Sequence, residues 1–248
     1  MKRRSTRILL YLAVLLLLLV ALSPIHYKRA ILHGNVNIDD YKIFSNRVIQ
    51  NAGTIPWKHD SAYNKTEIDA GKIAEFSKYG TTAFVVIQNN KIRYEAYWDG
   101  GSDTTRSNSF SAAKSIVSLL IGCAMDEGKI KSLDQPITDY LPGFKNTNGY
   151  KLSIRDLLTM SSGLDWDEGY SSLFSPTTKA YYGDQLDEQM LSLNIKPEPG
   201  KVFSYQSCDT QLLSMILEKA TGKTLSEYAS EKLWKPLGAE HPALLCLD

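Results

Sequence analysis

The sequence predicts an α+β fold, because strand patterns and helix patterns occupy separate parts of the chain. The segment from Ile68 to Tyr79 has helical spacing, residues 83–87 and 92–98 have strand composition, and the periodic segments after residue 110 are helical. The length of 248 residues is enough for one large domain or two interleaved ones. We therefore expect a sheet packed by helices, with an inserted helical region.

The two predicted strands are joined by a turn. Ala83 to Ile87 is a run of aliphatic, aromatic and β-branched residues, Asn89-Asn90 is a turn sequence, and the second strand ends near Trp98. Two strands alone are marginally stable, so they need partners from elsewhere in the chain. Beyond Gly238 the sequence has no further strand pattern to complete the sheet, which predicts an exposed sheet edge.

Helix start and stop signals divide the rest of the chain. Gly128 ends the apolar helix that begins near Ser111, and Gly222 ends an amphipathic helix over residues 211–221. Residues 164–185 are rich in Tyr, Ser, Asp and Thr, and we expect a long functional loop there. Further helices are expected to begin at Pro136, Ser153 and Thr224.

The first thirty residues differ in character from the rest. Four basic residues lie among the first seven, and an uncharged, Leu-rich stretch runs from Ile8 to Ile25. This pattern is typical of a signal peptide or a membrane anchor, and its basic flank predicts export of the domain that follows. Because Ala21-Leu22-Ser23 is a poor cleavage site, we favour an inner-membrane anchor with the domain facing the periplasm or the cell exterior. Secretion after cleavage is the alternative.

These patterns divide the chain into three parts. Residues 1–30 are the anchor or signal segment, residues 31–65 are an irregular polar linker, and residues 66–248 are the folded domain. The first part contains six of the 28 Lys and Arg residues and none of the 27 Asp and Glu residues, so the remainder has a formal charge of −5. That charge argues against nucleic-acid binding. The sequence does not indicate an oligomeric state.

Neither the cysteines nor the histidines form a recognisable site pattern. The three cysteines are too widely spaced for a disulfide scaffold, at most one bridge could form, and Cys208 has no histidine placed to activate it. The four histidines lack metal-ligand spacing, so zinc is not expected. A Ser-His-Asp triad is not indicated, because no histidine lies between His59 and His241 and G-x-S-x-G is absent. The cysteines are Cys123, Cys208 and Cys246.

A serine and a lysine one helical turn apart are the strongest functional signal. Ser111 is the only serine in the chain with a lysine three positions later, Lys114. On a helix the two share a face, so the amine can activate the hydroxyl as a nucleophile. Apolar residues cover nearly every face of the following helix, which predicts its burial and a costly desolvation of the lysine unless it has partners. The alternative is an N-cap serine beside a lysine that extends to solvent.

With these elements in place, the chain resembles the serine β-lactamase and penicillin-binding-protein superfamily, with a closer likeness to class C β-lactamase-like hydrolases, including 6-aminohexanoate-dimer hydrolases. The resemblance covers about residues 66–245 and implies a β-lactamase/transpeptidase-like fold with an antiparallel sheet. Besides Ser109–Ser115, the matching segments are Phe84–Tyr97, Leu133–Pro136, Ile154–Leu164, Pro199–Ser207 and Lys235–Gly238.

The resemblance implies roles for five residues. Ser111 matches the acylated nucleophile, Lys114 its activating amine, and Tyr205 the tyrosine of a Y-x-N motif. In that motif Ser207 replaces asparagine, as in the 6-aminohexanoate-dimer hydrolase and esterase-like branches, and Tyr170 matches a tyrosine that reaches the substrate. The expected substrates are small linear amides or esters, followed by cyclic β-lactams and D-alanyl peptides. No metal or organic cofactor is implied.

Other functions stay open at this point. The family's third motif, K-T-G or H-x-G on a later strand, has no counterpart before Asp248, so we expect the C-terminal strands to be missing and the chain to be a fragment or truncated product. The alternative function is a non-catalytic penicillin-binding-like module that binds cell-wall peptide or a partner protein. Asp165, Asp167 and Glu168 fit paired carboxylates for acid–base chemistry or, as we favour, a solvated loop.

Overall fold

The computed structural model of the chain describes residues 10–12, 14–15, 18–145, 148–170 and 172–247. Among these residues, none of the helices combines the length and the apolar character needed to cross a membrane. Much of the predicted anchor, including residues 1–9, lies outside the described residues, so the anchor stays a prediction. Helix α2 (Ile25–His33) follows this region.

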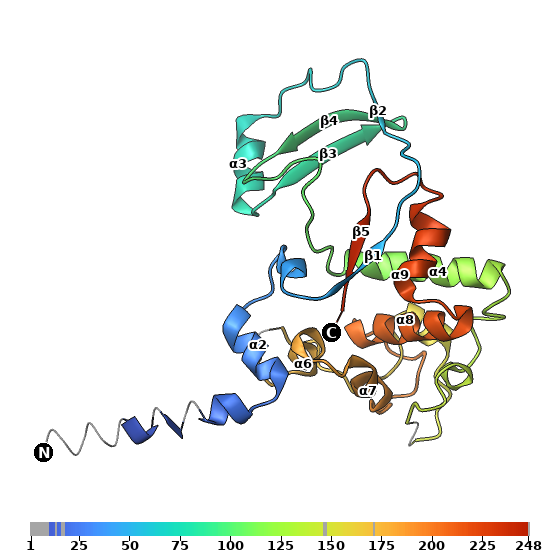
Figure 1. The fold of residues 1–248 in the computed structure, drawn as a ribbon. Helices are drawn as coiled ribbons and strands as arrows, with labels where there is room; N and C mark the ends of the chain where they lie inside the picture. Colours follow the sequence, from blue (N-terminus) through green and yellow to red (C-terminus); the bar gives the residue numbers. More distant parts are fainter. Residues whose placement is uncertain (1–9, 13, 16–17, 146–147, 171, 248) are drawn as a thin grey trace, which may run out of the picture.

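A three-stranded sheet forms one end of the molecule (Figure 1). Its order is β2-β4-β3, with β2 (Lys58–His59) parallel to β4 (Lys91–Tyr97) and β3 (Ala83–Gln88) antiparallel to β4. The predicted hairpin is confirmed, and Asn89 and Asn90 make the turn with positive φ angles of 51° and 54°. In the described part of the chain, β3 is an edge strand, as the sequence predicts.

Helix α3 (Ala70–Lys78) covers one face of this sheet. Its N-cap is Asp69, whose carboxylate accepts a hydrogen bond from the Gly71 N–H at 2.9 Å. The ring of Phe76 stacks on Phe84 of β3, with 4.8 Å between the ring centroids. Because side chains alternate along a strand, Val85 lies on the opposite face, where 44% of it is exposed.

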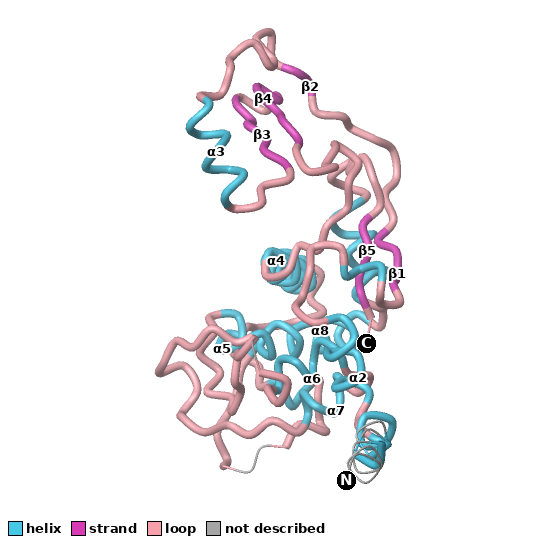
Figure 2. The backbone as a smooth tube through the Cα atoms, turned by 90° about the vertical axis from the view of Figure 1, so that its left-hand side faces the viewer, coloured by secondary structure: helices cyan, strands magenta, loops and turns pink. Residues whose placement is uncertain are grey.

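A two-stranded ribbon lies between the sheet and the helices (Figure 2). Strand β1 (Asn46–Ile49) pairs antiparallel with β5 (Ala243–Cys246). The chain after Gly238 therefore does form a strand, contrary to the prediction, although it pairs with β1 and not with the edge of the sheet. Residues 31–65, predicted to be an irregular linker, contain the short strands β1 and β2.

The helical part is organised around two long helices. Helices α4 (Ala112–Asp126) and α8 (Ser207–Thr221) pack against each other, and Leu120 and Ile216 are among their nearly inaccessible core residues. Helix α4 is buried on one face only, since 54% of Leu119 is exposed; the prediction of burial on nearly every face is wrong. The shorter elements are η1 (Asp40–Lys42), η2 (Ile137–Asp139), α5 (Ile154–Leu158), α6 (Pro176–Tyr182), α7 (Leu186–Leu191), α9 (Leu225–Ala229) and η3 (Ser230–Trp234).

Capping sequences correctly predict where two of the helices begin. Ser153 and Thr224 begin α5 and α9 with capping boxes, as the sequence predicts. Helix α8 begins at Ser207, earlier than predicted, and this places Tyr205–Ser207 at the N-terminus of a central helix. Helix α6 interrupts residues 164–185, which the sequence predicts to be a loop throughout.

Candidate active site

Ser111 and Lys114 face each other across the first turn of α4. Ser111 is the N-cap residue, and the Lys114 ammonium donates a hydrogen bond to Ser111 Oγ at 3.3 Å. Ser111 is exposed, whereas Lys114 is half-buried. Phe110, just before Ser111, has a φ of +43°, a strained value for an aromatic residue that the surrounding structure must hold in place. The helix thus presents the hydroxyl at the surface with the amine beside it.

The N-terminus of α8 supplies the second half of the site. Lys114 Nζ also donates a hydrogen bond to Ser207 Oγ at 3.1 Å, and it lies over the Tyr205 ring, 5.1 Å from the centroid. The structure therefore brings Ser111, Lys114, Tyr205 and Ser207 together from two helices that the sequence separates widely. With two hydroxyl partners and an aromatic face, the ammonium does not extend freely into solvent.

Glu168, which the sequence predicts to lie in a solvated loop with Asp165 and Asp167, is instead a central residue of this arrangement. Its carboxylate accepts hydrogen bonds from Ser207 Oγ at 2.5 Å, from the Ser207 N–H at 2.8 Å, from Trp166 Nε1 at 2.7 Å and from the Tyr170 hydroxyl. Burial opposes ionisation of Glu168, but these hydrogen bonds outweigh burial and lower the pKa of the carboxyl. The carboxylate therefore stays charged and fixes the first residue of α8.

The neighbouring carboxylates behave as the sequence predicts, but Glu168 does not. Asp165 forms an exposed ion pair with Lys196 at 2.8 Å, and Asp167 accepts a hydrogen bond from the Gly169 N–H at 2.9 Å. Both belong to a solvated loop. The same interpretation is wrong for Glu168, because its partners come from α8 and from the folded loop, and no local sequence signal indicates them.

Tyr170 joins the site through Glu168. Burial of the phenol comes first among the effects that raise the pKa of Tyr170 to about 12, and the hydrogen bond and negative charge of Glu168 come next. Its hydroxyl therefore remains protonated near neutral pH and can serve as a hydrogen-bond donor. Tyr170 is 63% exposed and therefore lies at the surface of the site.

A buried polar layer lies beneath the site. Gln206 Nε2 donates to the Leu164 carbonyl at 3.0 Å, and Ser162 Oγ donates to Asp209 Oδ1 at 2.6 Å. Asp209 is completely buried and its Oδ2 has no partner among the described residues, so burial raises the pKa of Asp209 to about 7. Burial likewise raises the pKa of the Cys208 thiol far above its usual range, which makes Cys208 a packing residue and not a nucleophile.

A pocket of about 390 Å³ opens beside Ser111. Ser111, Lys114, Tyr170 and Ser207 lie on its wall, together with apolar side chains from α7 and the preceding loops. This volume lies within the range of ~300–1,000 Å³ that is usual for small-molecule sites. Among the described residues, no group of three or more His, Cys, Asp or Glu side chains is placed to hold a metal ion, and all three cysteines are free thiols.

The sequence has relatives among known enzymes. Residues 70–245 match the family model described as Beta-lactamase. The chain is 28% identical over 178 residues to the 6-aminohexanoate-dimer hydrolase of Paenarthrobacter ureafaciens, which covers 68% of this chain and 45% of that protein. It is 31% identical over 124 residues to the N-acetylmuramyl-L-alanine amidase of Bacillus subtilis, which covers 47% of this chain and 28% of that protein. The chain thus spans less than half the length of these curated relatives.

Solved structures share the fold. A Bacillus anthracis protein assigned as a 6-aminohexanoate-dimer hydrolase superposes with a TM-score of 0.70 at 22% identity, covering 85% of this chain and 61% of that chain. EstCE1, described as a hydrolase with promiscuous acyltransferase activity, gives a TM-score of 0.51 at 20% identity, covering 68% of this chain and 50% of that chain. The fold is of the β-lactamase/transpeptidase type, as the sequence predicts. Since the family model matches well over half of its length, the chain belongs to the beta-lactamase family.

Proposed function

We propose that the protein is a serine hydrolase that cleaves an amide or ester bond through an acyl-enzyme on Ser111. The observation that carries this proposal is the placement of Lys114 Nζ at 3.3 Å from Ser111 Oγ, on the wall of a pocket that also presents Ser207 and Tyr170. The similarity to 6-aminohexanoate-dimer hydrolase supports a small linear amide or ester as the substrate.

In the acylation step, Ser111 Oγ attacks the carbonyl carbon of the substrate. Lys114 first releases one proton of its ammonium to solvent, and its amine then accepts the hydroxyl proton while the electron pair of the carbonyl double bond moves onto oxygen. The backbone N–H of Ser111, at the N-terminus of α4, is suited to stabilise this oxyanion, and one such donor lowers a barrier by about 3 kcal/mol.

Collapse of the tetrahedral intermediate releases the first product. The bond between the carbonyl carbon and the leaving nitrogen or oxygen breaks, and the leaving group takes up a proton. The Tyr205 phenol, whose ring lies under the Lys114 ammonium, can relay that proton from Lys114. Water then attacks the carbonyl carbon of the ester and gives a proton to Lys114 and Tyr205. The bond from that carbon to Ser111 Oγ breaks, Oγ takes the proton back, and the carboxylic acid is released.

Two further residues hold the site in order under this proposal. Ser207 holds the amine of Lys114 through a second hydrogen bond, and Glu168 holds Ser207. The protonated Tyr170 hydroxyl is available at the pocket wall as a donor to a substrate oxygen.

A fluorophosphonate probe, which phosphonylates an activated serine with loss of fluoride, tests the proposal on the full chain. We expect the probe to label the wild-type protein on Ser111, as located by peptide mass spectrometry, and we expect no labelling of Ser111→Ala. Ser115→Ala is the matched control, because Ser115 is an exposed serine one turn further along the same helix. Equal labelling of the wild type and Ser111→Ala would exclude Ser111 as the nucleophile.

We also propose that residues 1–30 anchor the domain on the outer side of a membrane, which the sequence pattern alone supports. Alkaline extraction of membranes from cells that express the full chain tests this placement. The protein should stay in the pellet, and a variant that lacks residues 1–30 should not. Recovery of the full chain in the wash would contradict the anchor.

A further inference from the structure

One wall of the pocket beside Ser111 comes from a segment outside the family match. Residues 25–44, which we call the N-terminal strap, precede the matched range of 70–245. Gly34, Asn35 and Val36 of the strap line the pocket directly. The shape of the pocket therefore depends on residues that the shared family sequence does not include.

The strap is fixed to α6, which runs beside α2 (Figure 1). Arg29 Nη1 donates a hydrogen bond to the Gly183 carbonyl at 3.0 Å, and the Tyr182 hydroxyl donates to the Gly34 carbonyl at 3.0 Å. The Tyr181 hydroxyl donates to the buried carboxylate of Asp40 at 2.8 Å. Contacts along the length of the strap thus make it a fixed wall.

The pocket is uncharged apart from the amine of the active site. Among the described residues that line it, Lys114 alone carries a formal charge, and its ammonium already donates to Ser111 and Ser207. The remaining wall includes the side chains of Val36, Leu173, Leu186 and Met190. A charge placed against these apolar side chains, away from Lys114, would lose its hydration without gaining an ionic partner.

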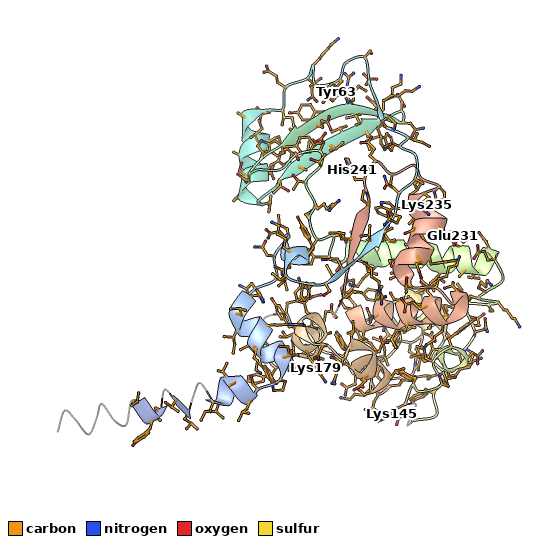
Figure 3. The ribbon with its side chains drawn as sticks, viewed as in Figure 1. Tyr63, Lys145, Lys179, Glu231, Lys235 and His241 are labelled. Atoms are coloured by element: carbon orange, nitrogen blue, oxygen red, sulfur yellow. The ribbon has the colours of Figure 1, made fainter. Side chains whose placement is uncertain are left out.

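The charged groups packed near the strap lie outside the pocket wall. Lys179 lies on α6 near α2 (Figure 3). Burial lowers the pKa of the His26 imidazole, the charge of Lys179 lowers it further, and the charge of Asp184 raises it. The Asp40 carboxylate accepts hydrogen bonds from the Tyr181 hydroxyl and from the Asn37 N–H. None of these four groups is among the pocket-lining residues.

We propose that this pocket takes an uncharged apolar acyl group, aliphatic or aromatic, and that the strap sets its length. The inference rests on the proposed function, because the acyl group stays bonded to Ser111 Oγ after the leaving group departs and must occupy the pocket that Ser111 lines. A 6-aminohexanoyl group, which would carry its ammonium into the apolar wall, is disfavoured.

Binding to the full-length Ser111→Ala variant tests the pocket without requiring turnover. Ligand-observed NMR titrations would compare hexanamide with 6-aminohexanamide and adipamic acid, which have the same chain length but carry one charge. We expect hexanamide to bind at least about tenfold more tightly than either charged amide. Equal or tighter binding of a charged amide overturns the proposal.

A matched pair of strap variants tests the wall itself. Val36→Phe narrows the pocket, whereas Ile38→Phe introduces the same side chain at a strap residue that is 45% exposed and does not line the pocket. We expect Val36→Phe to weaken hexanamide binding at least fivefold and Ile38→Phe to leave it unchanged. If the two variants behave alike, the strap does not set the size of the site.

Turnover of p-nitrophenyl acetate, butyrate and hexanoate separates this inference from the proposed function. For the wild type, kcat/KM should rise by about fourfold per methylene, and Val36→Phe should lose this gain at hexanoate. Turnover that depends on Ser111 but not on acyl length overturns the pocket assignment and leaves the hydrolase intact. Selective hexanamide binding without ester turnover would support the assignment of an apolar acyl pocket and contradict the proposed hydrolase function.

Discussion

Lys114 and Glu168 are linked through a single hydroxyl group, that of Ser207. The Lys114 ammonium donates to Ser207 Oγ at 3.1 Å, and Ser207 Oγ donates to Glu168 Oε1 at 2.5 Å. The serine that positions the amine is therefore itself positioned by a carboxylate. This chain of contacts joins α4, the loop before α6 and the start of α8, and the first two predictions follow from it.

Replacing Ser207 should lower kcat more than it raises KM. Ser207→Ala removes the hydroxyl that holds Lys114, and a small displacement of a reacting group can cost up to about 100-fold in rate. Ser207→Thr retains the hydroxyl and should keep most of the activity. Steady-state kinetics on one ester substrate would measure both variants. A rise in KM alone would show that Ser207 binds substrate and does not position the amine.

Replacing Glu168 should destabilise the fold as well as the site. Glu168→Gln keeps the size of the side chain but replaces one acceptor oxygen with a donor, so at least one of its four donors loses its partner. Each such loss in a half-buried site costs roughly 1–3 kcal/mol in the free energy of unfolding.

Asp165→Asn is the matched control for Glu168→Gln in urea unfolding. Asp165 lies on the same loop, but its ion pair with Lys196 is exposed, so its loss should cost less than about 1 kcal/mol. Similar losses for the two variants would mean that Glu168 has no special structural role.

Gly163 should be far less tolerant of substitution than a glycine with the same backbone angle elsewhere. Gly163 and Gly222 both have a φ of +69°, but a Cβ at Gly163 would collide with the backbone carbonyl of Pro197, whereas at Gly222 nothing lies within 4 Å. Gly222→Ala should lower the free energy of unfolding only by the cost of a left-handed backbone at a non-glycine residue, about 1–2 kcal/mol.

Gly163→Ala should cost more than Gly222→Ala, because the collision with Pro197 adds to the same backbone penalty. Thermal unfolding of both variants measures the difference. The neighbouring Leu164 pairs with Ile195, so the collision should also displace the loop that carries Glu168. Equal destabilisation by the two substitutions would show that the Pro197 contact relaxes without cost.

The stability of the protein should depend on pH through Asp209. Burial raises the pKa of Asp209 from its ordinary value of 3.8 to about 7, so between these values the folded state holds a proton that the unfolded state has lost. The stabilisation from this group is therefore complete below about pH 4 and is lost as the pH rises through about 7.

Asp209→Asn removes this titration. Between about pH 5 and 7, the free energy of unfolding of the wild type should fall relative to the variant by up to about 1.4 kcal/mol per pH unit. Urea unfolding across this range measures the slopes. Parallel slopes would show that Asp209 ionises normally in the folded protein.

The sequence predicted those features that depend on neighbouring residues. Capping boxes at Ser153 and Thr224 are local patterns, and so is the spacing that places Lys114 beside Ser111 on one helix. The strand pair around Asn89-Asn90 was equally accessible, because its turn and both strands are contiguous.

Features that depend on distant partners were not predictable. Strand β5 is a run of four residues that becomes a strand only by pairing with β1, from the other end of the domain. Glu168 stands in a polar loop like its neighbours, and only the arrival of Ser207 from α8 distinguishes it from Asp165 and Asp167. The pocket wall formed by residues 25–44 likewise required the contact of α2 with α6.

The side chain of Gln206 has a consequence for engineering. It donates to the Leu164 carbonyl and accepts from Ser162 Oγ at 3.3 Å, so it ties the first turn of α8 to the stretch that leads to Glu168 and Tyr170. A chimaera that imports this stretch from another family member, without the matching residue ahead of α8, would leave the graft untethered. The two segments should therefore be exchanged as one cassette.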